Sequence, residues 1–255
     1  MIKKVDLLIN ALPLKEMEAS LLQRAIVSFA DTIDTIDTDL VREAIHIAAY
    51  LHRNDYRQGR QGKSEDHYIT HPLRNTLRII RYGCTDQDII IASILHDTVE
   101  DHAFDIAEKF IEINVDSEEE ARSASYSYIA TRFGHNVAFI VKQVSNPLLV
   151  GDFTKEQKRA LYVAHVSEVI VIASVLMVKF SDFVDNAVGL YHNVKSSNTG
   201  MIQHLSRKYL PLVEEFEKQF NKLEAELPVS EDGFIMMRQH LQFGKLKLEE
   251  LQLVA

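Results

Sequence analysis

The sequence has little of several residue types, and each scarcity narrows the class of protein. Its 255 residues contain no tryptophan and a single cysteine, Cys84. One cysteine cannot form an internal disulfide, which excludes a disulfide-stapled secreted scaffold and is typical of the reducing cytoplasm. Only 9 glycines and 5 prolines occur, so long uninterrupted helices are allowed.

Excess positive charge and long apolar runs are also missing. The formal net charge is −9, whereas nucleic-acid-binding domains carry basic surfaces, so no nucleic acid polymer is expected as a partner. The apolar stretch 169–178 is far shorter than the roughly 20 residues of a membrane-spanning helix. No signal-like segment is present. We therefore expect a cytoplasmic protein without a membrane association.

What the sequence does contain is helical periodicity and a hydrophobic content of 46%, ample for a core. We expect a lead-in helix within 1–34, a core over 35–200 and a helical extension of the same domain over 201–255. Amphipathic helices are predicted at 13–31, 37–52, 72–83, 87–97, 103–133 (one or two helices, with an acidic break at 116–120), 135–145, 154–165, 168–193, 201–225 and 234–253. The stretch 53–66 is predicted to be a polar loop, and no strand is predicted.

The most informative pair is His96-Asp97, which ends the apolar run 89–95. An imidazole and a carboxylate are two unlike metal ligands, but neighbouring residues on a helix point about 100° apart. Both can bind one ion only if it lies beside the helix, so other segments must complete the site. The simpler alternative is a polar, solvated helix end.

A second histidine is predicted to lie close to this pair. Pro72 suits the first turn of a helix that ends at Gly83, and Asp86 can cap a second helix that runs to His96. Because the two helices have nearly equal lengths, an antiparallel hairpin brings His71 close to His96.

A carboxylate also follows the long apolar run that precedes Asp182. An unpaired buried carboxylate is costly, so Asp182 should be paired, coordinated or facing a cleft. Asn186 lies one helical turn further along the same face.

We therefore expect one metal site with two imidazoles and two carboxylates, formed by His71, His96, Asp97 and Asp182. Such ligands, without a thiolate, suit manganese, iron or zinc with open positions for water.

Five motifs occur in the order seen in RelA/SpoT-type HD hydrolases, and the chain resembles that family over roughly residues 35–215. The motifs are His52, Tyr68–Pro72, His96–Asp101, Phe133-Gly134, and Lys179–Asp182 with Asn186; the stretch 208–212 looks similar too. The resemblance implies an all-α HD-domain helical bundle with additional C-terminal helices. It also implies manganese as the metal and an alarmone as the substrate.

The resemblance assigns the acidic pair Glu100 and Asp101 to catalysis. Glu100 lies four residues after His96 and would project over the same rim of the helix. There it would position a water molecule or act as a general base, with Asp101 as its partner or substitute. The alternative is again a solvated helix end.

Other polar residues are candidates for substrate contacts. Asn186 would hydrogen-bond the ribose or a ligand carboxylate, unless its amide only ties two helices together. Relatives carry a Lys-Ser pair before the metal-ligating histidine, and Lys63-Ser64 falls at that place, with Arg60 as the substitute for an expected arginine. Arg57 lies in the same polar stretch, for which a solvated basic loop is the alternative.

Two further residues are assigned with less specific roles. Lys179 precedes Asp182 by three residues, within reach of a phosphate or a carboxylate. His52 is expected to be a supporting residue or a core histidine and not a ligand. The remaining histidines, His102 among them, have no motif partners, and a surface or core position would explain each.

The chain departs from the family pattern beside the expected site. His52 and His71 are 19 residues apart, which is longer than the usual gap. Phe183 and Val188 stand where cations are usual, and Gly189 where threonine is common. Either the insertion supplies the missing cations, or the phosphate arrangement of the substrate differs.

Three functional interpretations follow, all with a small-molecule nucleotide as the partner. The first is a manganese-dependent hydrolase that removes the 3′-diphosphate of (p)ppGpp or a related alarmone. The second is an HD phosphohydrolase acting on ppApp, NADPH or a dNMP. The third is a nucleotide-sensing module without turnover. The apolar face of the helix at 234–253 covers the core or forms a homodimer contact, and core packing is the commoner outcome.

Overall fold

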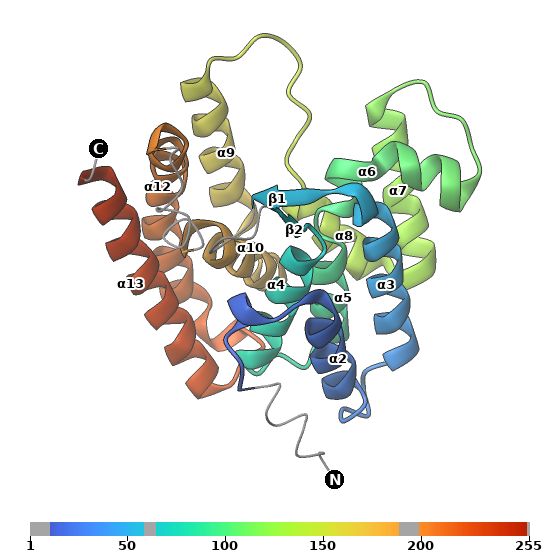
Figure 1. The fold of residues 1–255 in the computed structure, drawn as a ribbon, viewed down its shortest axis with the longest axis horizontal. Helices are drawn as coiled ribbons and strands as arrows, with labels where there is room; N and C mark the ends of the chain where they lie inside the picture. The colour runs from blue at the N-terminus through green and yellow to red at the C-terminus, as the bar shows by residue number, and fades with distance from the viewer. Residues whose placement is uncertain (1–10, 59–64, 189–198, 254–255) are drawn as a thin grey trace.

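The computed structural model describes residues 11–58, 65–188 and 199–253, and these are almost wholly helical (Figure 1). The predicted all-α fold is confirmed. The first half contains η1 (Leu14–Glu16), α2 (Ala19–Ala30), α3 (Thr38–Leu51), η2 (His52–Asn54), β1 (Tyr56–Gln58), β2 (Glu65–His67), α4 (Thr70–Arg81), α5 (Gln87–Leu95) and α6 (Thr98–Ile106). The second half contains η3 (Ala107–Ile111), α7 (Glu118–Phe133), α8 (His135–Val144), α9 (Lys155–Val169), α10 (Ala173–Phe183), η4 (Val184–Val188), α12 (Thr199–Leu223), η5 (Glu224–Glu226) and α13 (Glu231–Leu253).

Residues next to each helix end determine where α3 and α5 begin and where α4 ends. The carboxylates of Asp37 and Asp86 each accept hydrogen bonds from two backbone N–H groups in the first turn of α3 and α5, as predicted. Gly83 ends the α4 segment with a φ of 89°, a conformation that a glycine adopts at no steric cost.

Helix α4 lies at the centre of the bundle, between α2, α5 and α10 (Figure 1). Every residue from Thr70 to Ile80 is buried, including the guanidinium-bearing Arg74 and Arg78. Buried charges must be paired, so this helix requires an acidic partner from another part of the chain.

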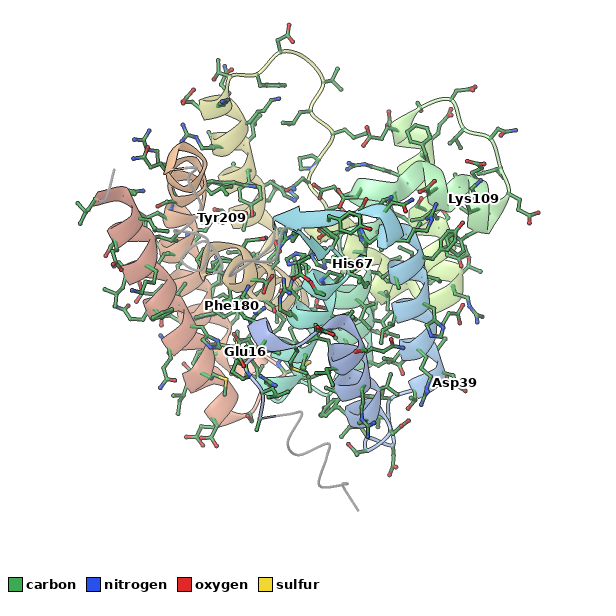
Figure 2. The ribbon with its side chains drawn as sticks, viewed as in Figure 1. Glu16, Asp39, His67, Lys109, Phe180 and Tyr209 are labelled. Carbon is green, nitrogen blue, oxygen red and sulfur yellow. The ribbon has the colours of Figure 1, made fainter. Side chains whose placement is uncertain are left out.

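The C-terminal helices α12 and α13 lie side by side (Figure 1); α12 packs on α10, and α13 packs on η4. The ring of Phe180, labelled in Figure 2, is 5.3 Å from that of Phe216 and 4.8 Å from that of Phe220, centroid to centroid. These edge-to-face contacts join the end of the chain to the helix that carries Asp182.

Helix α13 divides its apolar residues between two faces. Phe234, Leu241 and Leu251 are buried in the core, which agrees with core packing for one face. Ile235, Phe243 and Leu246 are exposed.

No helix of the described ranges is long and apolar enough to cross a membrane.

The structure corrects two predictions. The stretch predicted as a loop contains an antiparallel two-stranded hairpin in which Tyr56 pairs with His67; three-residue strands are too short to show a periodic pattern. The helix break predicted near residue 167 lies instead at Ile170–Ile172, where Ile172 is extended (φ −103°, ψ 121°). No polar cap marks this break, because the residues around it are β-branched and apolar.

Two other boundaries also differ. The predicted helix at 13–31 begins at Ala19, after the short turn η1. The region 103–133 is two helices, α6 with its π-helical continuation η3, and α7, which begins after the N-cap Ser117 within the predicted acidic break.

Candidate metal site and substrate pocket

The hairpin of α4 and α5 brings two histidines together. His71 lies in the first turn of α4 and His96 directly follows α5. Because the helices are antiparallel and of similar length, the ends carrying these residues meet, and the ring centroids are 5.3 Å apart. Both residues are buried.

Two carboxylates converge on these rings. The Oδ1 atom of Asp182, from α10, is 3.0 Å from His71 Nε2 and 3.9 Å from His96 Nε2. The Oδ2 atom of Asp97 is 3.1 Å from His96 Nε2 and 3.5 Å from His71 Nε2. The structure thus brings together the four side chains that the sequence analysis singled out, from three separate segments; the ligand atoms of His71, His96 and Asp97 all lie within 4.8 Å of one another.

Hydrogen bonds on the far side of each ring hold the two Nε2 atoms toward this point. His71 Nδ1 is 2.8 Å from Asp185 Oδ2, and His96 Nδ1 is 2.9 Å from the carbonyl oxygen of Ser93. His96 Nε2 is buried and has no hydrogen-bond partner among the described residues. Such backing is typical of metal-ligating imidazoles, so the four side chains fit a divalent metal.

The site is electrostatically unbalanced without a cation. Burial by itself lowers the pKa of His96, but the carboxylates of Asp97 and Asp182 outweigh it and raise the pKa to about 9. Burial raises the pKa of Asp97, yet His96 and His71 hold it well below its usual value. A proton on His96 therefore provides the positive charge that a metal ion would otherwise supply.

Asp185 was missed by the sequence analysis. Its side chain is fully buried, and its carboxylate accepts hydrogen bonds from Arg74 (3.0 Å), Arg78 (3.1 Å) and Lys15 (2.7 Å). Burial raises its pKa, but the cations around it hold the pKa far below the usual range. It is the acidic partner that α4 requires. The signal available in the sequence was the spacing of Arg74 and Arg78, which lie four residues apart on one face of the predicted helix.

Asn186 and Arg57 close one wall of the site. The Asn186 amide donates to Asp182 Oδ1 at 2.7 Å, and Arg57 donates to the Asn186 Oδ1 at 2.9 Å. Asn186 therefore contacts an expected ligand carboxylate, one of the two roles predicted for it. Arg57 lies on β1 and not in a solvated loop, and its guanidinium is 4.9 Å from the ring centroid of Tyr68.

Glu100 and Asp101 lie on the rim but are held differently. The two oxygens of Glu100 accept hydrogen bonds from the backbone N–H and the side-chain amide of Asn146, each at 2.8 Å. No described residue donates a hydrogen bond to the carboxylate of Asp101. Its partial burial, together with the charges of Asp97 and Glu100, raises its pKa to about 7.

These groups line a pocket of about 480 Å³ including its open mouth. Its wall is formed by Arg57, Tyr68, His71, Asp97, Glu100, Asp101, Asn146, Tyr162, Lys179, Asp182, Asn186, Lys208 and Tyr209. The Tyr68 hydroxyl donates to Asp97 at 2.7 Å. Lys179 is buried and lines the pocket as predicted, and Lys208 from α12 adds a second cation.

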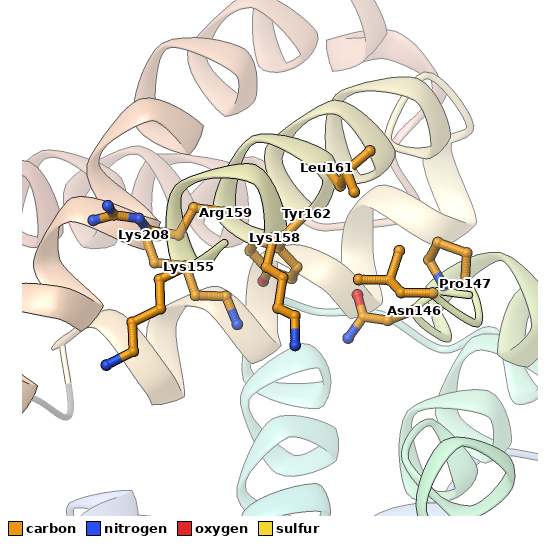
Figure 3. A pocket seen from close by; sticks show the side chains of 9 residues that line it. Asn146, Pro147, Lys155, Lys158, Arg159, Leu161, Tyr162 and Lys208 are labelled. Carbon is orange, nitrogen blue, oxygen red and sulfur yellow. The ribbon is translucent and has the colours of Figure 1, made fainter. Parts of the chain in front are cut away.

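A second, basic chamber adjoins this pocket (Figure 3). The two share Asn146, Tyr162 and Lys208 as a common wall. The chamber adds three cations from α9, which are Lys155, Lys158 and Arg159. The two cavities together therefore bring cations from α9 and α12 close to the four-residue site.

The remaining predicted residues fall outside this wall. Arg60, Lys63 and Ser64 lie outside the described residues. His52 is buried behind Tyr68, with the rings stacked at 4.7 Å, in keeping with the supporting or core role predicted for it. His102 does have a partner, because its Nε2 is 3.1 Å from His52 Nδ1.

Comparisons with known proteins agree with the motif analysis. Guanosine-3′,5′-bis(diphosphate) 3′-pyrophosphohydrolase MESH1 of Xenopus tropicalis is 27% identical over 134 residues, 52% of this chain and 62% of that protein. The Drosophila melanogaster MESH1 is 22% identical over 197 residues, 77% of this chain and 93% of its own length. A guanosine-3′,5′-bis(diphosphate) 3′-pyrophosphohydrolase of Aquifex aeolicus is 26% identical over 166 residues, 64% of this chain and 20% of that protein. No family model matches the chain.

A solved structure of a metazoan ortholog of SpoT that hydrolyses ppGpp has the same fold. It superposes with a TM-score of 0.53 at 18% identity, over 85% of this chain and 96% of that one. The resemblance to RelA/SpoT-type hydrolases is thus confirmed as a distant one. The chain spans less than two thirds of the first two relatives that it matches.

Proposed function

We propose that this protein is a phosphohydrolase that removes the 3′-diphosphate of (p)ppGpp or a closely related alarmone. The proposal rests mainly on one observation: the Nε2 atoms of His71 and His96 face the carboxylates of Asp97 and Asp182 at the wall of an open pocket. The relatives named as 3′-pyrophosphohydrolases indicate the class of substrate.

The four side chains would hold a divalent metal, which we propose to be manganese. Two imidazole nitrogens and two carboxylate oxygens suit Mn²⁺, Fe²⁺ or Zn²⁺. A metal bound there would lower the pKa of a coordinated water and polarise a phosphoryl oxygen.

Glu100 and Asp101, on the rim of the pocket, would have different roles in catalysis. In the hydrolysis, the water oxygen bonds to phosphorus and the bond from phosphorus to the 3′ oxygen breaks. The water loses a proton, and the departing 3′ oxygen takes up a proton from solvent to become the ribose hydroxyl. We assign proton acceptance to Asp101, whose carboxylate receives no hydrogen bond from a described residue. Glu100, which is held by Asn146, would orient the water or shape the rim.

The rest of the wall would orient the nucleotide. With the 3′ phosphates at the four-residue site, Lys179 and Lys208 lie in the same pocket to pair with their charge. The adjoining basic chamber then suits the 5′ phosphates, because a ligand that spans the shared wall carries anionic groups at both ends. Arg57 donates a hydrogen bond to Asn186, which in turn donates one to Asp182. These two residues would therefore orient the Asp182 carboxylate toward the metal.

A single assay tests this proposal. The purified protein with Mn²⁺ is incubated with ppGpp, pppGpp, ppApp, NADPH and dNMPs, and the products are separated by ion-exchange chromatography. We expect diphosphate and GDP from ppGpp, and Asp97→Ala should abolish both metal binding and turnover. Preferred turnover of ppApp, NADPH or a dNMP would assign the site to another nucleotide. No turnover of any compound by a metal-loaded protein would contradict an enzymatic role and support the sensing module.

A further inference from the structure

A second group of metal-ligating side chains lies behind Tyr68, outside the pocket. It comprises His52 at the end of α3, Asp55 at the start of the hairpin, and His102 in α6. Asp55 Oδ2 is 2.8 Å from His52 Nδ1 and 2.7 Å from His102 Nε2, and these two nitrogens are 3.1 Å apart. Three donor atoms from three segments thus form a closed triangle.

With the Asp55 carboxylate ionised, no placement of protons on the two rings satisfies all three sides of this triangle. If both ring nitrogens carry protons, both can donate to Asp55, but the two N–H groups of His52 and His102 then face each other. If His52 Nδ1 is bare, it can accept from His102, but its lone pair then faces the Asp55 carboxylate at 2.8 Å. One unfavourable contact remains in either case.

A metal ion removes this conflict, because all three atoms can then direct lone pairs at one cation. Ligands about 2.1 Å from an ion and at right angles to one another lie about 3 Å apart, close to the three observed separations. Two imidazoles and one carboxylate on one face of an ion, with the other positions open, form a known binding pattern for divalent transition metals.

The surroundings of the triangle suit this use. His52 is buried and Asp55 and His102 are partly buried, so the three donor atoms are partly shielded from bulk water. The far nitrogen of His102, Nδ1, is 3.6 Å from the carboxylate of Asp105, which is an ion-pair separation longer than a hydrogen bond. The backbone of His102 departs from helical geometry within α6 (φ −135°, ψ 27°).

We propose that His52, Asp55 and His102 bind a second divalent transition-metal ion, separate from the ion of the pocket. This site would join α3, the start of the hairpin and α6. It would also support Tyr68, which stacks on His52 and donates to Asp97. The proposal does not depend on the substrate or on turnover.

Metal counting tests the proposal. The full chain is stripped with a chelator, reloaded with Zn²⁺ alone, desalted and analysed by mass spectrometry of the metal. We expect two ions per chain for the natural sequence and one for His102→Ala. His46→Ala, which removes an exposed histidine from α3, should retain two. Asp55→Asn keeps the shape of the side chain and should also bind only one ion per chain. Agreement between this variant and His102→Ala would show that the lost ion is not the result of a folding defect in one of them.

A reciprocal measurement identifies the ion that is lost. The double variant Asp97→Ala, Asp182→Ala lacks the two carboxylates of the pocket and, when loaded with Co²⁺, should bind one ion per chain. This ion should give visible absorption bands. The bands should disappear in the triple variant that also carries His102→Ala. Two outcomes would overturn the proposal: equal metal content in His102→Ala and the natural chain, or no ion in the background that lacks the pocket carboxylates. Either result leaves the alarmone hydrolase proposal intact, because that proposal requires only the ion of the pocket.

Discussion

His71 Nδ1 lies 2.8 Å from Asp185 Oδ2, and both side chains are removed from solvent. The same carboxylate is bonded to Arg74 and Arg78 of α4. One residue therefore pairs with both buried guanidinium groups of the central helix and sets the direction in which His71 presents Nε2 to the pocket. The stability of the core and the geometry of the site depend on the same side chain.

Asp185→Asn should weaken both functions. The variant leaves two buried guanidinium groups without their counter-ion, which we expect to lower the free energy of unfolding by about 3–5 kcal/mol. Loss of the charged acceptor for His71 Nδ1 should weaken metal binding by about 10–100-fold. Chemical denaturation and a Mn²⁺ titration measure the two effects. Asp34→Asn, at an exposed position, is the control and should change neither.

Metal binding should become stronger as the pH rises. His96 has a pKa raised to about 9 in the metal-free site, so below that pH an incoming ion must displace a proton. Apparent affinity for Mn²⁺ should therefore increase about tenfold per pH unit toward pH 9, with one proton released per ion. Calorimetry in buffers of different ionisation enthalpy counts the protons. A pH-independent affinity between pH 6 and 8 would contradict a charged His96.

The raised pKa of His96 should also make the stability of the metal-free protein depend on pH. Whereas metal binding becomes stronger as the pH rises, this contribution to stability becomes smaller. Because the pKa of His96 is higher in the folded state than the ordinary value of about 6.5, its contribution to stability is fully present below that value. The contribution is lost as the pH rises through about 9. Thermal unfolding of the stripped protein should show this loss, and His96→Ala should not.

Asp101→Asn should lower turnover without loss of metal. A positioned general base contributes about 10²–10⁴-fold, so kcat should fall by that factor while the metal content remains unchanged. Glu100→Gln retains an oxygen that can accept a hydrogen bond from Asn146, and we expect a smaller loss. If Glu100→Gln has the larger effect on kcat, the two roles are exchanged.

The basic chamber should set affinity and not the chemical step. Lys158 and Arg159 lie on α9, apart from the four-residue site. Replacing both with alanine should raise KM for ppGpp about tenfold, the scale of a charge-assisted contact, with little change in kcat. The effect should disappear for a nucleotide without 5′ phosphates. Lys218→Ala, on the exposed side of α12, is the matched control.

Gly233 allows α13 to dock on the end of α4. A Cβ atom at this position would lie 1.8 Å from the carbonyl oxygen of Tyr82, far inside van der Waals contact. Gly233→Ala should therefore force the helices apart and lower the free energy of unfolding by about 1–3 kcal/mol or more. Gln242→Ala, at an exposed position of the same helix, should be close to neutral in the same denaturant titration.

Much of the fold was predictable because its signals are local. The caps Asp37 and Asp86 lie within three residues of the N–H groups that they bind, and the stop at Gly83 depends on its own backbone. The approach of His71 to His96 could also be predicted, since two adjacent helices of similar length leave few alternatives. In contrast, the break at Ile170–Ile172 has no polar signal and was placed wrongly.

The sequence by itself determined the helices, the hairpin of α4 and α5, and the residue types gathered for the site. Only the tertiary structure decided that Asp185 supports His71 and that His102 meets His52. Those contacts join residues 50 to 114 positions apart. Nothing in the local pattern encodes such pairs, because the packing of whole helices determines which distant side chains meet.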